Sequence, residues 1–524
     1  MQEPIHRKIR RPAFAWLLCG FALVTLAYPV YQQLGDAYAH SRAGAKVARY
    51  AQMAETTVHF GFTTTRFMPV GSPHPSASSA AELPYAFEQP VLDHLLRSVA
   101  RRQFGEGEKV MRGPSFVAWL IAGLLVFLLL ARQTGVAGSV TGLCAWLSLP
   151  AAGIMVLSSV QSATAMAAAL SGIWFYCRFR NNPGRMNYGL MLASFFASMQ
   201  CAWAGYAAPL LLAAAAGLGL AQLASDRKRV WVGLLSTMAS AFVVTWLHAD
   251  VFSGTSGQFF LALKGLGDFP FAELDRATGP RTLFWSLMAL FGRASLALIF
   301  ACLLQVLVGS DAKPWRKPWF FCLVWGLVGF TLSPASTSVT DLRAIYWLPL
   351  VAATFALSAE IIAKTLQPHL KFNAGILVAI IAMGAFGWFA WSRPLPAPAV
   401  AAGENHRKLA ESLRRWIEPQ DRRLIVTNYS GYDADILGSY LGADLVTAPT
   451  LTAADLDSKL RPRLQREFAF LKGQRALFIV APLTDSSPDA QRRDAALRIQ
   501  LLRIGSPYKG YIETIDISTW LWKR

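Results

Sequence analysis

Residues 115–132 read SFVAWLIAGLLVFLLLAR, an apolar run that ends on a single arginine. A helix needs about 20 mostly apolar residues to cross the hydrocarbon core of a bilayer. The run therefore predicts a transmembrane helix, and ten further stretches of the same kind bring the expected number of spans to eleven. In chain order the spans are expected at 13–32, 115–132, 137–157, 161–177, 187–203, 205–224, 230–248, 283–308, 318–334, 343–363 and 373–391.

The composition of the whole chain agrees with a membrane protein. Of its 524 residues, 54% are hydrophobic and only 15% are charged, whereas about 25% of the residues in soluble domains are charged. Disorder and a single soluble domain are therefore excluded. A net charge of +19 would suggest nucleic-acid binding in a soluble protein, but cytoplasmic loops of membrane proteins also collect Lys and Arg. We assign the charge to topology and to lipid phosphate, and expect no nucleic-acid partner.

The basic residues predict the orientation in the membrane. Connections after even-numbered spans carry cations such as Arg132, Arg178 and Lys313, whereas the short connections between them carry none. By the positive-inside rule, the N-terminus is cytoplasmic and the C-terminus lies outside. The first apolar stretch is longer than the usual 7–15-residue core of a signal peptide, so we expect an uncleaved anchor.

Three segments are then expected on the outer side: a long loop at 33–114, a second loop at 249–282 and everything from about 393. Residues 36–60 have the spacing of an amphipathic helix lying along the membrane. Its apolar positions include Val47, Tyr50, Met53 and Val58.

The C-terminal part predicts a small soluble α/β domain. A Pro/Ala-rich linker at 393–399 follows the last span of the 1–392 membrane domain, and proline at this density makes a stiff spacer. Strand-like runs alternate with helical stretches over 400–524, which is typical of a parallel or mixed sheet. The expected fold class is thus mainly α and polytopic, with a C-terminal α/β domain.

The cysteines give no sign of a metal site. All six lie in or at the ends of apolar runs, and none forms a CxxC pair, so neither a zinc site nor a disulfide framework is expected. The adjacent Asp93 and His94 are a weak signal for a metal or a sugar. We expect no organic cofactor, and the sequence leaves a divalent metal ion open.

An ordered set of short motifs runs from the long outer loop into the second span. It comprises FEQPVL at 87–92, Phe104-Gly105, and RGPS at 112–115, and RAIYWLP follows at 343–349. Over roughly 13–391 the chain resembles the GT-C superfamily of polyprenyl-phosphate-sugar-dependent glycosyltransferases. Relatives in that superfamily include bacterial protein O-mannosyltransferases and lipid A aminoarabinose transferases.

The resemblance implies a bacterial inner-membrane enzyme that moves a sugar from a polyprenyl-phosphate carrier to a periplasmic lipid, glycan or protein, with inversion at the sugar carbon. Such transfer needs a base for the acceptor hydroxyl and cations for the phosphate leaving group. Asp36 is the first candidate for the base and Glu55 the second. The candidate substrate-binding residues are Arg112, Arg343, Tyr346, Gln89, Arg293 and Asp268.

Positive charge also gathers on the expected outer side, where the positive-inside rule does not require it. Just before the second span lie Arg97, Arg101, Arg102, Lys109 and Arg112. We expect this cluster to face an anionic lipid phosphate.

One departure from the family pattern leaves an alternative open. The first-loop window in which relatives carry an Asp, around Ala43 and Ala45, holds none. The chain is then either a transferase with a shifted base or a catalytically degenerate GT-C-like scaffold of an envelope glycan assembly system. A transporter or flippase ranks last, because the internal repeats typical of such proteins are not evident.

Overall fold

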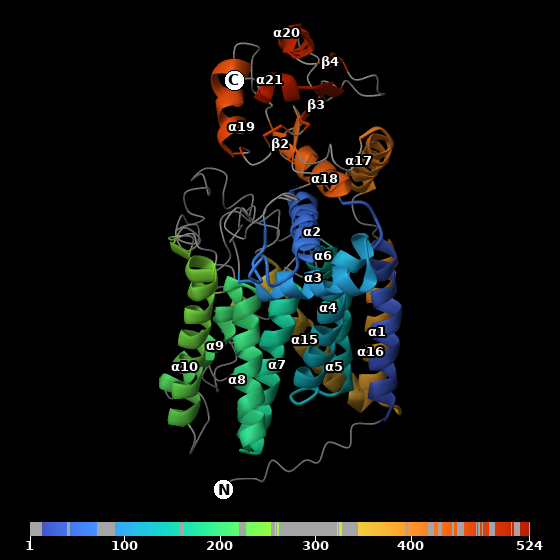
Figure 1. Cartoon of the computed structure of the whole chain (residues 1–524). Helices are drawn as coiled ribbons and strands as arrows, with labels where there is room; N and C mark the ends of the chain where they lie inside the picture. The colour runs from blue at the N-terminus through green and yellow to red at the C-terminus, as the bar shows by residue number, and fades with distance from the viewer. Residues whose placement is uncertain are drawn as a thin grey trace. The chain divides into compact units, whose positions relative to one another are not determined.

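The computed structural model divides the chain into two compact units (Figure 1). Unit 1 comprises Met1–Leu34, Arg112–Thr245 and Phe260–Leu395, and unit 2 comprises Gly35–Met111, Trp246–Phe259 and Pro396–Arg524. The structure describes residues 13–38, 42–70, 90–157, 162–218, 227–252, 257, 259–260, 322, 324–326, 328, 344–392, 397–417, 424–427, 432–442, 445–447, 455–467, 469, 472–473, 475–480, 488–504, 506–507 and 514–522.

The described part of unit 1 is a bundle of helices that run roughly alongside one another (Figure 1). Five segments are long and apolar enough to cross a membrane: Ala13–Gln33, Glu108–Leu130, Arg227–Phe252, Ile345–His369 and Ala374–Ser392. The helices are α1 (Ala13–Gln33), α4 (Glu108–Leu130), α5 (Val136–Ser148), α6 (Pro150–Leu157), α7 (Ser162–Asn181), α8 (Arg185–Cys201), α9 (Ala207–Gly217), α10 (Arg227–Trp246), α15 (Leu348–Leu366) and α16 (Ala374–Ser392).

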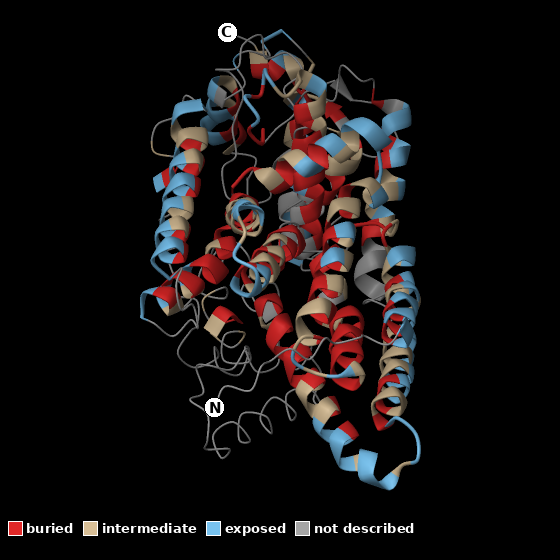
Figure 2. Cartoon of the chain, turned by 90° about the horizontal axis from the view of Figure 1, so that it is seen from below, coloured by how far each residue is buried: buried red, intermediate tan, exposed pale blue. Residues whose placement is uncertain are grey.

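Helix α5 is buried from Ala137 to Ser148, so it lies in the interior of this bundle. Figure 2 shows the buried residues of the chain in red. Helix α5 packs on α15, where a Cβ added at Gly142 would lie 3.1 Å from the carbonyl oxygen of Ala352. Small residues permit such close approach of helices. The outer helices instead expose large apolar side chains, with Val24 71% and Trp388 79% exposed. An apolar exterior on an apolar bundle is suited to lipid.

The predicted spans agree with these helices wherever the structure describes them. Every predicted span overlaps a helix except the eighth, which lies outside the described residues, and the ninth, which lies mostly outside them. The expected span 137–157 consists of two helices, α5 and α6, with α6 beginning at Pro150. Proline suits a first helical turn, where no N–H donor is needed, and interrupts a helix elsewhere. The total of eleven spans stays a prediction.

In unit 2, the segment between α1 and α4, which the sequence predicts to be an outer loop, forms α2 (Arg42–Phe60) and α3 (Leu92–Phe104). The apolar positions Val47, Tyr50 and Met53 of α2 are each no more than 5% exposed, because α2 packs against α3 and against α18 (Tyr432–Leu441). The amphipathic helix is therefore present, but its apolar face is covered by protein. This corrects the expectation that the face rests on the membrane.

The C-terminal segment of unit 2 forms a five-stranded mixed sheet of order β2-β1-β3-β5-β4. Strand β1 pairs in parallel with β2 and β3, and β5 pairs antiparallel with β3 and β4. The strands are β1 (Ile425–Thr427), β2 (Leu445–Thr447), β3 (Leu477–Ile479), β4 (Ser506–Pro507) and β5 (Thr514–Asp516).

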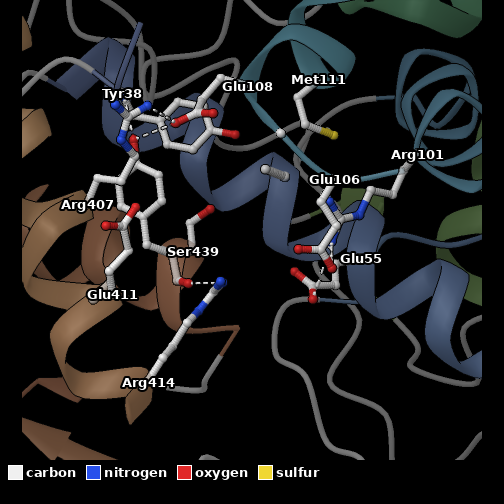
Figure 3. A pocket seen from close by; sticks show the side chains of 14 residues that line it. Tyr38, Glu55, Arg101, Glu106, Glu108, Met111, Arg407, Glu411, Arg414 and Ser439 are labelled. Carbon is white, nitrogen blue, oxygen red and sulfur yellow. Dashed lines mark hydrogen bonds and ion pairs between the residues drawn. The ribbon is translucent and has the colours of Figure 1, made fainter. Parts of the chain in front are cut away.

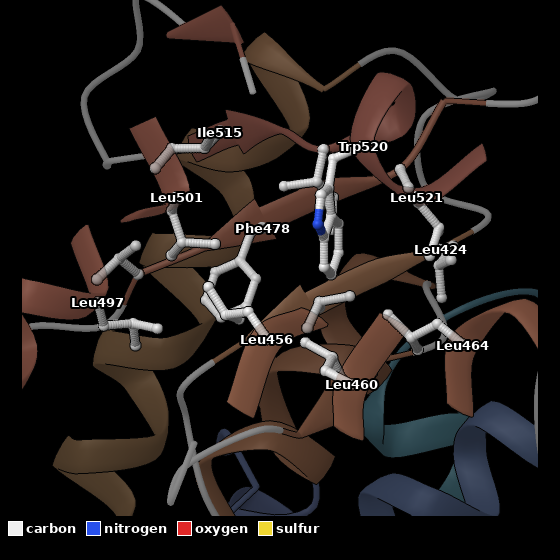
Figure 4. Packing of buried hydrophobic residues seen from close by; sticks show 14 residues of the cluster. Leu424, Leu456, Leu460, Leu464, Phe478, Leu497, Leu501, Ile515, Trp520 and Leu521 are labelled. Carbon is white, nitrogen blue, oxygen red and sulfur yellow. The ribbon is translucent and has the colours of Figure 1, made fainter. Parts of the chain in front are cut away.

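Successive strand residues point to opposite sides of a sheet. Both sides of this sheet carry apolar side chains, and helices cover both. Val426 and Phe478 pack with η8 (Leu456–Leu460), α19 (Arg461–Glu467), α20 (Pro488–Ile504) and α21 (Ser518–Trp522), as Figure 4 shows for Phe478. Ile425 and Leu477 pack instead with α17 (Ala397–Trp416) and α18. That 400–524 folds as a domain of its own stays a prediction.

Candidate functional site

A pocket of about 220 Å³ lies within unit 2 (Figure 3). One wall comes from the segment after α1, from α2 and from the region joining α3 to α4. The other wall comes from α17 and α18. The lining residues are Tyr38, Ala51, Glu55, Arg101, Glu106, Gly107, Glu108, Met111, Arg407, Ala410, Glu411, Arg414, Ser439 and Tyr440. The lining is thus rich in carboxylates, guanidinium groups and hydroxyls.

Glu55 on α2 and Arg101 on α3 meet at one end of the pocket (Figure 3). Nη2 of Arg101 lies 3.4 Å from Oε1 of Glu55 and 2.9 Å from Oε1 of Glu106. Burial raises the pKa of Glu55 above its ordinary value of 4.5, and the positive charge of Arg101 opposes that rise. A carboxylate in this state is a stronger base than an exposed one.

Tyr440 on α18 organises the other end. Its hydroxyl donates to Oε1 of Glu108 at 3.0 Å and accepts the backbone N–H of Tyr38 at 2.8 Å. The rings of Tyr38 and Tyr440 stack with centroids 5.4 Å apart, and Nη1 of Arg407 lies 3.6 Å from Oε1 of Glu108. Burial and the charge of Glu108 raise the pKa of Tyr440, so its hydroxyl keeps the proton that it donates.

A buried polar network behind the pocket holds α3 against α2. Nε2 of His94 lies 2.9 Å from Oγ1 of Thr57. Arg97 pairs with Asp93 at 2.7 Å and also donates to the carbonyl oxygen of Met111. Burial, together with the nearby charge of Arg97, lowers the pKa of His94 to about 3, so the imidazole is neutral.

The Asp93–His94 pair does not form part of a larger cluster of metal ligands. Asp93 is occupied by Arg97 and His94 by Thr57. In the described ranges, no group of three or more His, Cys, Asp or Glu side chains could hold a metal ion. Through Thr57 the pair joins α3 to α2, and Nδ1 of His94 is buried without a hydrogen-bond partner among the described residues.

The two candidate bases occupy different places. Glu55 lines the pocket, with 38% of its side chain exposed. Asp36 is half-buried in the bend after α1 and is not a lining residue. The pocket therefore includes the second candidate rather than the first.

Two of the expected substrate-binding residues lie in unit 1. Arg112 is 4% exposed and donates to the carbonyl oxygens of Leu34 at 2.9 Å and Gln33 at 3.4 Å, at the end of α1. Tyr346 is buried in the turn before α15 and donates to Oγ of Ser162 at 3.3 Å. Gln89, Asp268, Arg293 and Arg343 lie outside the described residues.

The expected cluster of phosphate-facing cations is wrong for Arg97, whose charge is buried against Asp93. Arg101 in turn bridges two glutamates of the pocket. These cations lie on one segment of the sequence, whereas Glu55, an acidic partner of Arg101, lies on α2 and meets Arg101 only because α2 packs against α3.

Sequence reasoning also missed the contribution of α17 and α18. Arg407, Arg414 and Tyr440 line the pocket, yet they lie beyond the region that resembles the GT-C superfamily. A signal was present in the spacing of Arg407, Glu411 and Arg414. Positions i, i+4 and i+7 lie on one face of a helix, and charged residues gather on that face here.

Comparison with known proteins gives a match in structure but not in sequence. No protein-family model matches the chain, and no curated protein matches it by sequence. The fold is similar to ArnT from Cupriavidus metallidurans in the apo state, with TM-score 0.58 and 14% identity over 98% of this chain and 99% of that one. The same protein bound to undecaprenyl phosphate gives TM-score 0.57 and 13% identity, with the same coverage.

A second match is the archaeal oligosaccharyltransferase AglB from Archaeoglobus fulgidus, in complex with an inhibitory peptide and a dolichol-phosphate. It gives TM-score 0.50 and 11% identity over 97% of this chain and 74% of that one. At such identities the likeness concerns the fold. The chain therefore shares the largely helical fold of these two solved structures.

Proposed function

We propose that the protein is a membrane glycosyltransferase that moves a sugar from a polyprenyl-phosphate carrier to an acceptor hydroxyl. The observation that carries the proposal is Glu55, a carboxylate of raised pKa beside Arg101 in a polar pocket. The solved structures support the donor class, since ArnT is bound there to undecaprenyl phosphate and AglB to a dolichol-phosphate.

The proposed reaction is a single displacement with inversion. The acceptor oxygen attacks the anomeric carbon, and the bond from that carbon to the phosphate oxygen breaks with its electron pair leaving on the phosphate. Glu55 takes the proton of the acceptor hydroxyl, as a general base within hydrogen-bond reach would. Arg101 keeps Glu55 ionised between turnovers, because an adjacent positive charge favours the carboxylate.

The phosphate contacts of the donor belong to the same proposal. Arg343 and Arg112 remain the proposed cations that contact the donor phosphate. Tyr346 is proposed to bind the substrate beside Arg343. The proposed location is a bacterial inner membrane, with the N-terminus in the cytoplasm and the acceptor on the periplasmic side. The acceptor class, whether lipid, glycan or protein, stays open.

The proposal is tested with the purified full-length protein, labelled polyprenyl-phosphate sugars and a panel of acceptors. We expect Glu55→Gln to lower the transfer rate by about 10²- to 10⁴-fold, the usual contribution of a general base. Asp36→Asn is the matched comparison and is expected to keep the rate. The opposite pattern would assign the base to Asp36, and absence of transfer from every polyprenyl-phosphate sugar would refute the function.

A non-catalytic scaffold is the second candidate. It is favoured by the absence of Asp from the first-loop window and by the ion pair that already engages Glu55. In that case neither Glu55→Gln nor Asp36→Asn changes glycan output in cells, although deletion of the whole chain does.

A further inference from the structure

The two walls of the pocket come from segments far apart in the sequence, yet they fit closely. Tyr440 of α18 stacks on Tyr38 and bonds to its backbone N–H. A Cβ added at Gly403 of α17 would overlap the carbonyl oxygen of Tyr38. Such close approach requires glycine, so α17 and α18 form a fixed wall of the pocket.

The charged side chains on the wall formed by α2, α3 and the start of α4 already take part in ion pairs and hydrogen bonds within the protein. Arg101 lies between Glu55 and Glu106, and Glu108 accepts from Tyr440 and lies near Arg407. These groups are positioned by protein contacts and need no ligand to hold them.

Helix α17 contributes two charged side chains, Glu411 and Arg414, that can form further hydrogen bonds beyond their contacts within the protein. Arg407, Glu411 and Arg414 share one face of the helix, and Glu411 forms no ion pair with any described residue. Arg414 donates to the carbonyl oxygen of Tyr440, which engages one of the five N–H donors of a guanidinium. Figure 3 shows Arg407, Glu411 and Arg414 together on the α17 side of the pocket.

We propose that this pocket binds a single sugar ring that carries no negative charge, through the ring's hydroxyls, and that Glu411 and Arg414 of α17 form hydrogen bonds with that ring. The inference rests on the proposed function and assigns part of the specificity to the C-terminal segment. Carboxylates accept hydrogen bonds from sugar hydroxyls and guanidinium groups donate to sugar oxygens. A volume of about 220 Å³ is below the roughly 300–1,000 Å³ that holds a drug-sized ligand, so one ring is the suitable size.

The charge balance of the lining argues against an anionic ring. Four carboxylates line the pocket (Glu55, Glu106, Glu108 and Glu411) against three guanidinium groups (Arg101, Arg407 and Arg414). A carboxylate on the ligand would meet Glu411, and like charges at close range repel. Neutral rings are therefore preferred to acidic ones.

The test measures sugar binding to the full-length protein by saturation-transfer NMR, separately from transfer. The probes are methyl glycosides of neutral hexoses and pentoses, with glucuronic acid as the anionic probe and glucosamine as the cationic one. We expect neutral rings to bind at least about tenfold more tightly than glucuronic acid. The carboxylate of glucuronic acid cannot donate a hydrogen bond to Glu411 and is repelled by it, and loss of a hydrogen bond to a charged group alone typically weakens binding by about that factor.

Variants on one helix make the test specific. Arg414→Gln is expected to weaken binding of neutral rings about tenfold, and Glu411→Gln to reduce the discrimination against glucuronic acid. Arg415→Gln is the matched control, because Arg415 is an exposed neighbour that does not line the pocket. Equal binding by Arg414→Gln and Arg415→Gln would overturn the proposal.

The other outcomes are equally decisive. Glucuronic acid binding as tightly as the neutral rings or glucosamine, or more tightly, would overturn the assignment of a ring without negative charge. Transfer without any binding to this pocket would leave the proposed function standing and refute this inference. Binding that responds to Arg414→Gln, without transfer from any carrier, would support this inference and refute the proposed function.

Discussion

At the scale of single residues, Glu55 shows how neighbours set the state of a functional group. Burial is the largest influence and raises its pKa, Arg101 lowers it, and Glu106 raises it. A carboxyl whose pKa is raised is ionised only above that pKa. If Glu55 is the base, activity is therefore present at higher pH and is lost as the pH falls through the raised pKa.

The two neighbours of Glu55 predict opposite shifts of the pH profile. Arg101→Gln removes a stabilising positive charge, so the acidic limb of kcat/KM should move to higher pH. Glu106→Gln removes a repulsive negative charge, so the limb should move to lower pH. Arg102→Gln, at an exposed position beside Arg101, should leave the profile in place. A limb that is the same in all three variants would exclude Glu55 as the titrating group.

At the scale of elements, α3 presents its polar side inward. Asp93, His94, Arg97 and Ser98 are buried, whereas Leu96, Val99 and Phe104 are at least 43% exposed. A pattern of apolar and charged residues predicts an amphipathic helix but does not say which face is covered. Asp93 pairs with Arg97, His94 contacts Thr57, and Ser98 donates to the backbone, which lowers the free-energy cost of burying these groups. Nδ1 of His94 has no hydrogen-bond partner among the described residues.

Arg112 joins α4 to the end of α1, where helix carbonyls lack partners of their own. Arg112→Met should lower the thermal midpoint, because a hydrogen bond to a charged group contributes about 1.5–3 kcal/mol. If Arg112 also contacts the donor phosphate, as proposed, the KM for the donor should rise in the protein that remains folded. An unchanged KM would leave Arg112 with the structural role alone, and an unchanged thermal midpoint would contradict that structural role. Arg185→Met, at an exposed position, is the control.

At the scale of the whole molecule, the C-terminal segment carries its own core yet shares the pocket. Both hydrophobic clusters of the sheet consist of residues from Ala410 onward. The pocket, by contrast, needs Tyr38, Glu55 and Arg101 from the outer-loop segment. Stability and function are therefore distributed differently along the chain.

This arrangement predicts the behaviour of residues 397–524 expressed alone. The segment should unfold cooperatively on heating, as followed by circular dichroism, because two closed apolar clusters drive two-state behaviour. It should not bind neutral glycosides, since half of the pocket is missing. A segment without a cooperative transition would mean that packing of α18 against α2 is required for the sheet to form.

The sequence by itself indicated a membrane protein, the positions of the apolar helices that lie in the described residues, and the resemblance that agrees with the fold of the solved structures. Each depends on runs of apolar residues or on ordered local motifs, which can be recognised in the sequence alone. It ranked Asp36 above Glu55 and did not include α17 or α18 in the site. Only the tertiary structure shows that Glu55 lines a pocket, that Asp36 does not, and that residues of α17 and α18 form part of its wall. Burial, ion pairing and the meeting of Tyr38 with Tyr440 depend on contacts between segments far apart in sequence, which no local pattern records.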